Sequence, residues 1–230
     1  MKVLLFIFII PAICVAQVHT DLEAINNTRG SVFDVRNSNV KAYSGIDGTP
    51  YYYEEFLPIS IEGYKNALPL VRYNAFEDEM EFKTEKGLSY VNKAEQMRIK
   101  FPSLSKTYIL LNYIDYGLTS QTGFLVEVHN GVYSLLKSER SHIVEYNNNT
   151  TNTYLKAKNP YFEKVKPNYY IFDGTTVYPV PKNNKELDLW IERYKPRSKP
   201  ELLNFIKSQK LNFGKEKDLI LFTEYLNNSK

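Results

Sequence analysis

Side chains capable of acid–base, nucleophilic or metal chemistry are scattered along this sequence. The three histidines, His19, His129 and His142, have no partner at i+2 or i+4 with which to form a zinc pair. Residues 103–106 match Ser-x-x-Lys by letter, but Pro102 and the strand-like residues that follow place this match in a turn. We therefore expect no catalytic residue, no metal site and no cofactor.

Acidic side chains offer a stronger case for chemistry. They cluster at Glu77, Asp78, Glu79 and Glu81. Two carboxylates that share a pocket can hydrolyse a glycoside or hold a hard cation, so a hydrolase with its acids in the 77–81 region is one alternative. Strict alternation over residues 79–83 predicts instead that Met80 and Phe82 face the core while Glu79 and Glu81 face water.

Aromatic residues are the best candidates for binding. The candidate binding residues are Tyr51, Tyr52, Tyr53, Arg72, Tyr73 and Asn74. Successive strand residues point to opposite faces, so at least one of the three consecutive tyrosines should leave the core. Exposed tyrosine offers a large contact area with a hydrogen-bonding tip, which suits a sugar or a protein. The competing interpretation is that packing covers these rings and that Arg72 is a structural clamp on Asp78 or Glu79.

Composition narrows the class of protein. The chain has 29 basic and 26 acidic residues and a net charge of +3, without the basic stripe expected of a nucleic-acid binder. Its single cysteine is Cys14, which lies in the leader described next, so the remaining chain has no thiol. The 19 tyrosines and 13 phenylalanines against 10 glycines favour a β-rich body, because aromatic residues suit a pleated, half-buried surface.

The first sixteen residues have the pattern of a secretory signal peptide. Lys2 is followed by an apolar run over residues 3–15, and Ala16 precedes Gln17 as a cleavage site. This run is shorter than the roughly 20 residues that a membrane-spanning helix requires. We expect export from the cytoplasm and no transmembrane segment in the mature chain.

The elements that must position the candidate residues fall into three segments. Residues 17–41 are polar and form a lead-in arm, and residues 42–181 carry recurrent strand signals typical of an antiparallel β domain. Asn130-Gly131 and Asp173-Gly174 predict two tight hairpins, with Val126 paired to Leu135 and Tyr170 paired to Val177. Residues 182–230 show helical periodicity and predict two to three short helices packed on the β domain.

Three short elements occur in an order that resembles a known family. They are Gly48-Thr49-Pro50-Tyr51, Arg72-Tyr73-Asn74 and Asp78-Glu79-Met80-Glu81, followed by the first hairpin and the helical tail. The chain is similar in these elements to an uncharacterised family of exported proteins of Bacteroidota, especially flavobacteria. The resemblance implies a periplasmic or extracellular location in a Gram-negative bacterium, either in the envelope or secreted, and supplies no catalytic residues.

Taken together, these observations predict a mainly β (α+β) fold, with a curled antiparallel sheet or open barrel and short C-terminal helices. The expected function is a non-enzymatic interaction module that contacts a protein or glycan of the cell envelope. A carbohydrate-binding module that uses Tyr51–Tyr53 and a hydrolase that uses the 77–81 carboxylates remain the alternatives.

Overall fold

The computed structural model describes residues 36–37, 43–65, 67–85, 87–117, 119–146, 158–194 and 199–228. The expected signal peptide, residues 1–16, lies outside the described residues. Of the expected arm, residues 17–41, only Arg36–Asn37 is described, and it pairs as strand β1 with β5.

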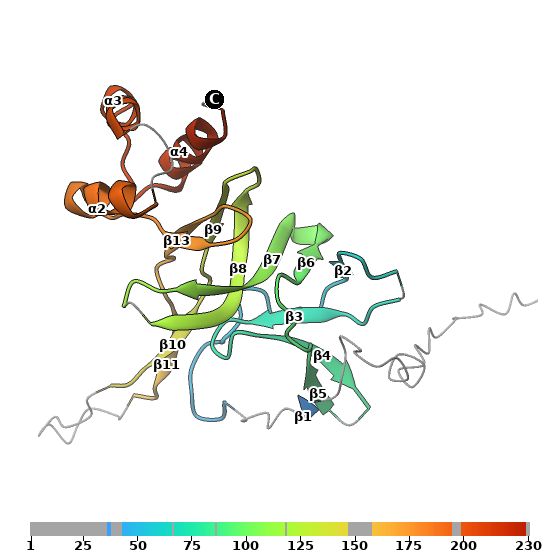
Figure 1. Ribbon diagram of the computed structural model, residues 1–230. Helices are drawn as coiled ribbons and strands as arrows, with labels where there is room; N and C mark the ends of the chain where they lie inside the picture. Colours follow the sequence, from blue (N-terminus) through green and yellow to red (C-terminus); the bar gives the residue numbers. More distant parts are fainter. Residues whose placement is uncertain are drawn as a thin grey trace, which may run out of the picture.

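Strands dominate the described part of the chain (Figure 1). They are β1 (Arg36–Asn37), β2 (Ser60–Ile61), β3 (Val71–Asn74), β4 (Glu79–Thr84), β5 (Gly87–Tyr90), β6 (Arg98–Phe101), β7 (Lys106–Ile114), β8 (Ser120–His129), β9 (Ser134–Lys137), β10 (Ser141–Val144), β11 (Tyr161–Lys164), β12 (Tyr169–Phe172) and β13 (Val177–Pro179). A short 3-10 helix, Pro102–Leu104, links β6 to β7.

These strands form two antiparallel sheets and a ribbon. A four-stranded sheet has the order β1-β5-β4-β3, and a seven-stranded sheet has the order β13-β12-β9-β8-β7-β6-β2. The two-stranded ribbon pairs β10 with β11. Neighbours along the chain pair in most of these steps, as expected for short antiparallel connections.

The seven-stranded sheet curls around one of its faces. Ile109 and Leu125, from neighbouring central strands, share a buried cluster with Tyr170 and Val177, which lie on β12 and β13. Because β7 and β13 are separated by three strands in the sheet order, their side chains can meet only if the sheet bends over this face. The sheets do not close into a barrel.

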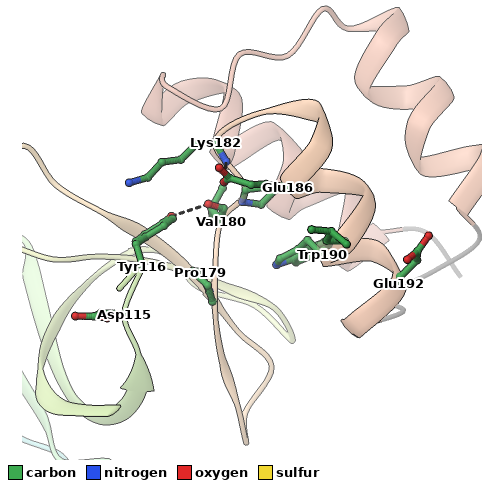
Figure 2. A pocket seen from close by; sticks show the side chains of 10 residues that line it. Asp115, Tyr116, Pro179, Val180, Lys182, Glu186, Trp190 and Glu192 are labelled. Atoms are coloured by element: carbon green, nitrogen blue, oxygen red, sulfur yellow. Dashed lines mark hydrogen bonds between the residues drawn. The ribbon is translucent and has the colours of Figure 1, made fainter. Parts of the chain in front are cut away.

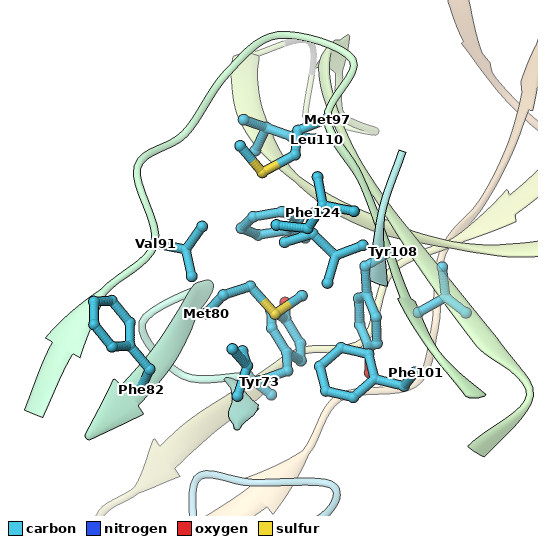
Figure 3. Close-up of a cluster of buried hydrophobic side chains, with 14 residues drawn as sticks. Tyr73, Met80, Phe82, Val91, Met97, Phe101, Tyr108, Leu110 and Phe124 are labelled. Atoms are coloured by element: carbon cyan, nitrogen blue, oxygen red, sulfur yellow. The ribbon is translucent and has the colours of Figure 1, made fainter. Parts of the chain in front are cut away.

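The opposite face of the curled sheet is covered by two different layers. The four-stranded sheet covers β6, β7 and the middle of β8, and the buried side chains between the two sheets include Tyr73, Met80, Phe101, Tyr108 and Phe124 (Figure 3). The helices cover β9 and β12, where Leu135 and Ile171 are fully buried. One sheet therefore joins both halves of the core.

Three helices follow the last strand in the described chain: α2 (Asn184–Tyr194), α3 (Lys199–Ser208) and α4 (Glu216–Asn228). The side chain of Asn183 caps α2, since its Oδ1 accepts a hydrogen bond of 2.9 Å from the amide of Glu186. Leu187, Trp190 and Ile191 form one buried stripe of α2 at spacings of three and four residues. Figure 1 shows the three helices gathered at one end of the molecule.

Both expected hairpins exist, but their predicted pairings are wrong. Val126 pairs with Lys137 instead of Leu135, and a bulge lies between Glu127 and His129. Gly131 does not adopt the positive φ of a type I′ turn. The loop is held from outside, because Asn227 of α4 bonds both the amide and the carbonyl of Tyr133, at 2.8 and 2.9 Å.

In the second hairpin, Phe172 pairs with Val177, where the sequence predicted Tyr170. Four residues, 173–176, form the connection instead of two. The carboxylate of Asp173 sets this length, because its Oδ1 accepts hydrogen bonds from the amides of Thr175 and Thr176 at 2.9 and 2.7 Å. An Asp side chain that bonds amides two and three residues ahead stabilises a wider turn.

The predicted fold class is confirmed: the protein is mainly β, with a curled antiparallel sheet and short helices at its C-terminal end. None of the helices in the described residues has the length and apolar character required to cross a bilayer.

Candidate binding site

The first group of predicted site residues converges on the carboxylate of Glu81. Glu81 is only 2% exposed, so the predicted water-facing orientation is wrong. Its Oε2 accepts hydrogen bonds from Arg72 Nε at 2.8 Å and from the Tyr51 hydroxyl at 3.0 Å. Its Oε1 accepts a hydrogen bond of 2.7 Å from Asn74 Nδ2. We call these four residues, together with Tyr43, the Glu81 network.

The segment that precedes the sheet explains this burial. Tyr51 bridges to Asn74 and Leu57 bridges to Val71, so residues 51–57 lie along the edge strand β3. The Arg72 guanidinium stands 3.7 Å above the ring of Tyr51. An alternating pattern predicts a solvated face only when nothing covers it. Here both faces of β4 are covered, and the irregular segment 51–57 covers the face on which Glu81 lies.

The side chains of the Glu81 network also bond one another and the backbone nearby. Asn74 Nδ2 also donates to the Tyr43 hydroxyl at 3.0 Å, and Asn74 Oδ1 accepts the amide of Glu77 at 3.1 Å. Burial, reinforced by the charge of Glu81, raises the pKa of Tyr51. The predicted clamp of Arg72 is real, but it closes on Glu81 and not on Asp78 or Glu79. This arrangement joins the 43–57 segment to the sheet.

A second polar network surrounds Arg140 and contains the predicted residue Tyr73. Arg140 Nη2 lies 3.1 Å from Asp78 Oδ2, and its Nη1 donates to the carbonyl of Phe124 at 3.0 Å. The hydroxyl of Tyr73, which is 4% exposed, donates to Asp78 Oδ1 at 2.7 Å. Burial raises the pKa of the Asp78 carboxyl, and the positive charge of Arg140 opposes this rise.

Gly123 makes room for the Arg140 network. A Cβ on this β8 residue would fall against Asp78 Oδ2 and within 2.8 Å of Arg140 Nη2. Asp78 itself has a positive φ of 55°, which is uncommon outside glycine. The β3–β4 turn therefore places the Asp78 carboxylate against the backbone of β8 in the seven-stranded sheet.

The other two predicted tyrosines lie near lysines. Tyr52 is half-buried, and its hydroxyl lies 3.5 Å from the carbonyl of Arg140. Tyr53 is 41% exposed, with Lys106 Nζ 4.7 Å from the centre of its ring. The three consecutive tyrosines thus have three different environments, and they do not form a row of exposed rings.

A groove that sequence reasoning missed lies between α2 and the β7–β8 turn (Figure 2). Its volume is about 760 Å³, within the range of ligand pockets. The lining residues are Asp115, Tyr116, Pro179, Val180, Pro181, Lys182, Glu186, Leu189, Trp190 and Glu192. Asp115 and Tyr116 lie on one side of the groove, and Trp190 and Glu192 lie on the helix opposite (Figure 2).

The walls of the groove are fixed by hydrogen bonds. The Tyr116 hydroxyl lies 2.6 Å from the carbonyl of Val180 and 2.9 Å from that of Tyr169, which ties the turn to β12 and β13. Asp115 Oδ1 accepts the amides of Gly117 and Thr119 at 2.8 and 3.0 Å. The side of the groove formed by the β7–β8 turn is therefore held in place by hydrogen bonds.

No periodicity marks these residues in the sequence, because they come from a turn after β7, from the end of β13 and from α2. One sequence signal of the groove was available: Leu189 is an apolar residue of α2 that lies outside its buried stripe. It is 59% exposed. An exposed leucine is ordinary by itself and becomes informative only beside a groove.

Metal-ligand geometry is not found: within the ranges that the structure describes, no three His, Cys, Asp or Glu side chains gather as a possible metal site. His142 Nε2 lies 3.6 Å from Glu163 Oε2, and both side chains are more than half exposed. His19 lies outside the described residues.

Comparison of the chain with protein-family models, with curated proteins and with solved structures finds no significant match.

Proposed function

We propose that the mature chain is an exported, non-enzymatic interaction module of a bacterial cell envelope or of the surrounding medium. The observation that supports this proposal best is the pairing of three of the four acids of the 77–81 region. Glu81 is engaged by Arg72, Tyr51 and Asn74, Asp78 by Arg140 and Tyr73, and Glu79 by Lys93 at 3.1 Å. Carboxylates held in this way stabilise the fold.

Hydrolysis by a carboxylate pair requires one acid with a raised pKa that meets substrate and a second that faces it across the scissile bond. The raised pKa of Asp78 fits the first condition. However, its two oxygens already accept hydrogen bonds from Tyr73 and from the amide of Phe124, and the ion pair with Arg140 occupies the same side chain. Binding without turnover is therefore the function that this geometry favours.

Export is supported by the sequence of residues 1–16, and the family resemblance of the 48–82 elements points to the same location in Bacteroidota. A fold without cysteine after Cys14 needs no disulfide exchange when it reaches an oxidising compartment. A glycan partner through Tyr51–Tyr53 is a weaker proposal, because Tyr51 is 9% exposed and is bonded to Glu81.

The test is to purify the exported chain from its own host and to sequence its N-terminus, which we expect at Gln17. Reversible cross-linking in the envelope, followed by reconstitution with the purified partner, should then give saturable binding. The same preparation should turn over no chromogenic glycoside or ester. Turnover that is abolished by Asp78→Asn or Glu81→Gln, with the variants folded by circular dichroism, would overturn the proposal, as would an uncleaved leader on a cytoplasmic pool.

A further inference from the structure

We infer that the groove between α2 and the β7–β8 turn binds a positively charged peptide segment of a partner protein, with an apolar side chain seated against Leu189 and Pro179. The inference rests on the proposed function, since it assigns a site and a partner chemistry to that interaction module. Three properties of the groove support it: an apolar floor, an excess of carboxylates and the absence of an open aromatic face.

The floor of the groove is apolar and partly exposed. Leu189 is 59% exposed on α2, and the half-buried Pro179 lies on the strand side. Beneath them, Val180 and Trp190 are 2% and 5% exposed and are part of the core. A guest side chain that removes Leu189 and Pro179 from water gains roughly 25 cal/mol for each Å² of apolar surface buried. The floor therefore favours an aliphatic or proline side chain.

The charge of the groove walls indicates which other residues the bound peptide carries. Three carboxylates, Asp115, Glu186 and Glu192, line the groove against a single ammonium, that of Lys182. This negative balance is local, because the chain as a whole carries a net charge of +3. The principle that complementary potentials attract and orient partners then favours Lys or Arg in the guest.

Of the three carboxylates, that of Glu192 is shared with Lys199, whose Nζ lies 3.4 Å away, and the hydrogen bonds to Glu186 leave its negative charge in place. Glu186 accepts the amide of Lys182 at 2.8 Å and the side-chain amide of Asn183 at 2.6 Å, and neither donor carries a charge. The Lys182 ammonium stands 3.7 Å over the ring of Tyr116 and lies 3.3 Å from Asn168 Oδ1. Lys182 and Tyr116 line both this groove and the neighbouring hollow that Asn168 lines, so the ammonium lies at the boundary between the two.

A sugar is a poorer fit to the same walls. Sugars stack on an exposed aromatic face, but the ring of Tyr116 is covered by Lys182 and Trp190 is only 5% exposed. Most of the exposed apolar surface belongs to Leu189, which offers no hydrogen bond to a hydroxyl group. A peptide with an apolar side chain followed by basic residues uses both the floor and the walls.

The test measures binding of fluorescein-labelled synthetic peptides to the full exported chain by anisotropy. The first peptide contains Leu, Pro and Lys, the second replaces every Lys with Glu, and the third replaces every Leu and Pro with Ser. We expect only the first to bind, with a Kd that rises with salt because the attraction is screened. Equal binding of the Glu peptide, or displacement of the first peptide by a soluble oligosaccharide, would overturn the inference.

Matched variants locate the site. Leu189→Gln removes the exposed apolar contact and should weaken binding roughly tenfold, as expected for loss of a buried aliphatic side chain at an interface. Leu221→Gln is the control, because Leu221 is a 44% exposed leucine of α4 that does not line the groove. Equal weakening by both variants would contradict the assignment.

The charged walls have an equally close control. Glu192 and Asp188 both lie near Lys199 Nζ, at 3.4 and 3.2 Å, but only Glu192 lines the groove. Glu192→Gln should weaken the Lys peptide roughly threefold, the size of an exposed charge interaction, and Asp188→Asn should not. If the partner from the host binds the Leu189→Gln variant as well as the unaltered chain, this inference fails while the proposed function stands. Turnover that depends on Asp78 or Glu81 would instead overturn the proposed function itself.

Discussion

Glu81 shows how a single residue can invert its expected role. By alternation it belongs on the water-facing side of β4, and in the structure it is the buried acceptor for Arg72, Tyr51 and Asn74. A buried ion pair contributes little net stability when compared with an apolar replacement, but the loss of one partner strands a charge. The contribution of the Arg72–Glu81 ion pair is therefore tested by removing one of the two charges and then both.

Glu81→Gln should lower the free energy of unfolding by about 3 kcal/mol, because the Arg72 guanidinium loses its counter-charge at a site where it is only 15% exposed. The double variant Arg72→Met/Glu81→Gln should recover part of this loss, since no charge then remains buried. Urea unfolding monitored by tyrosine fluorescence measures both. A double variant that loses as much as the two single variants combined would contradict the pairing.

Asp173 gives the molecule an acid-sensitive turn. Burial acts to raise the pKa of this carboxyl, but hydrogen bonds from the Tyr178 hydroxyl and from the amides of Thr176 and Thr175 outweigh it and lower the pKa to about 2. The folded state therefore releases the proton more readily than the unfolded state. The stability that the ionised group supplies is present above about pH 4 and is lost as the pH falls through 2.

Asp173→Asn should cost roughly 1 kcal/mol at neutral pH, since neutral hydrogen bonds replace charge-assisted ones. It should also flatten the fall in unfolding free energy between pH 4 and pH 2. The control is Glu163→Gln, at a carboxyl that is 54% exposed and makes none of these turn contacts. An unaltered slope in Asp173→Asn would show that other carboxylates set the acid limit.

At the scale of elements, the loops are determined by what packs against them. The Asn130-Gly131 pair is a strong hairpin signal, yet the turn is wider and the pairing is shifted. The reason lies 94 residues away, where Asn227 of α4 bonds both backbone groups of Tyr133. Two hydrogen bonds to a fixed helix, each worth about 1 kcal/mol, outweigh the local preference of Asn-Gly for a two-residue turn.

Asn227→Asp tests this attachment because it keeps the acceptor for the Tyr133 amide and removes the donor to its carbonyl. We expect a loss of about 1 to 2 kcal/mol in unfolding free energy and faster amide exchange in the β8–β9 loop. Asn228→Asp, at the exposed neighbouring position, supplies the control. Equal exchange rates in the two variants would mean that the loop holds its shape without the helix.

At the scale of the whole molecule, the curled sheet is the element that both halves share. The four-stranded sheet and the helices cover different parts of the same face of this sheet. Loss of either layer would therefore expose buried core residues to water. The helices are 10 to 13 residues long, too short to be stable by themselves in water. The helical segment and the β domain should therefore unfold together.

Removal of residues 182–230 should abolish cooperative unfolding, because Leu135 and Ile171, now fully buried, would face water. We expect binding of a hydrophobic dye and loss of the near-ultraviolet dichroism, the signs of a collapsed chain without fixed packing. A truncated chain that retains a single sharp thermal transition would show instead that the β domain is autonomous.

Local sequence patterns predict the class of fold, two to three C-terminal helices and both hairpins. These features depend on local periodicity, capping and turn residues, which act over a few neighbouring positions. The burial of Glu81, the space left at Gly123, the final hairpin pairings and the α2 groove were decided only in the tertiary structure. Each depends on which distant segment covers a given face, and residues separated by tens of positions leave no periodic signal of that contact.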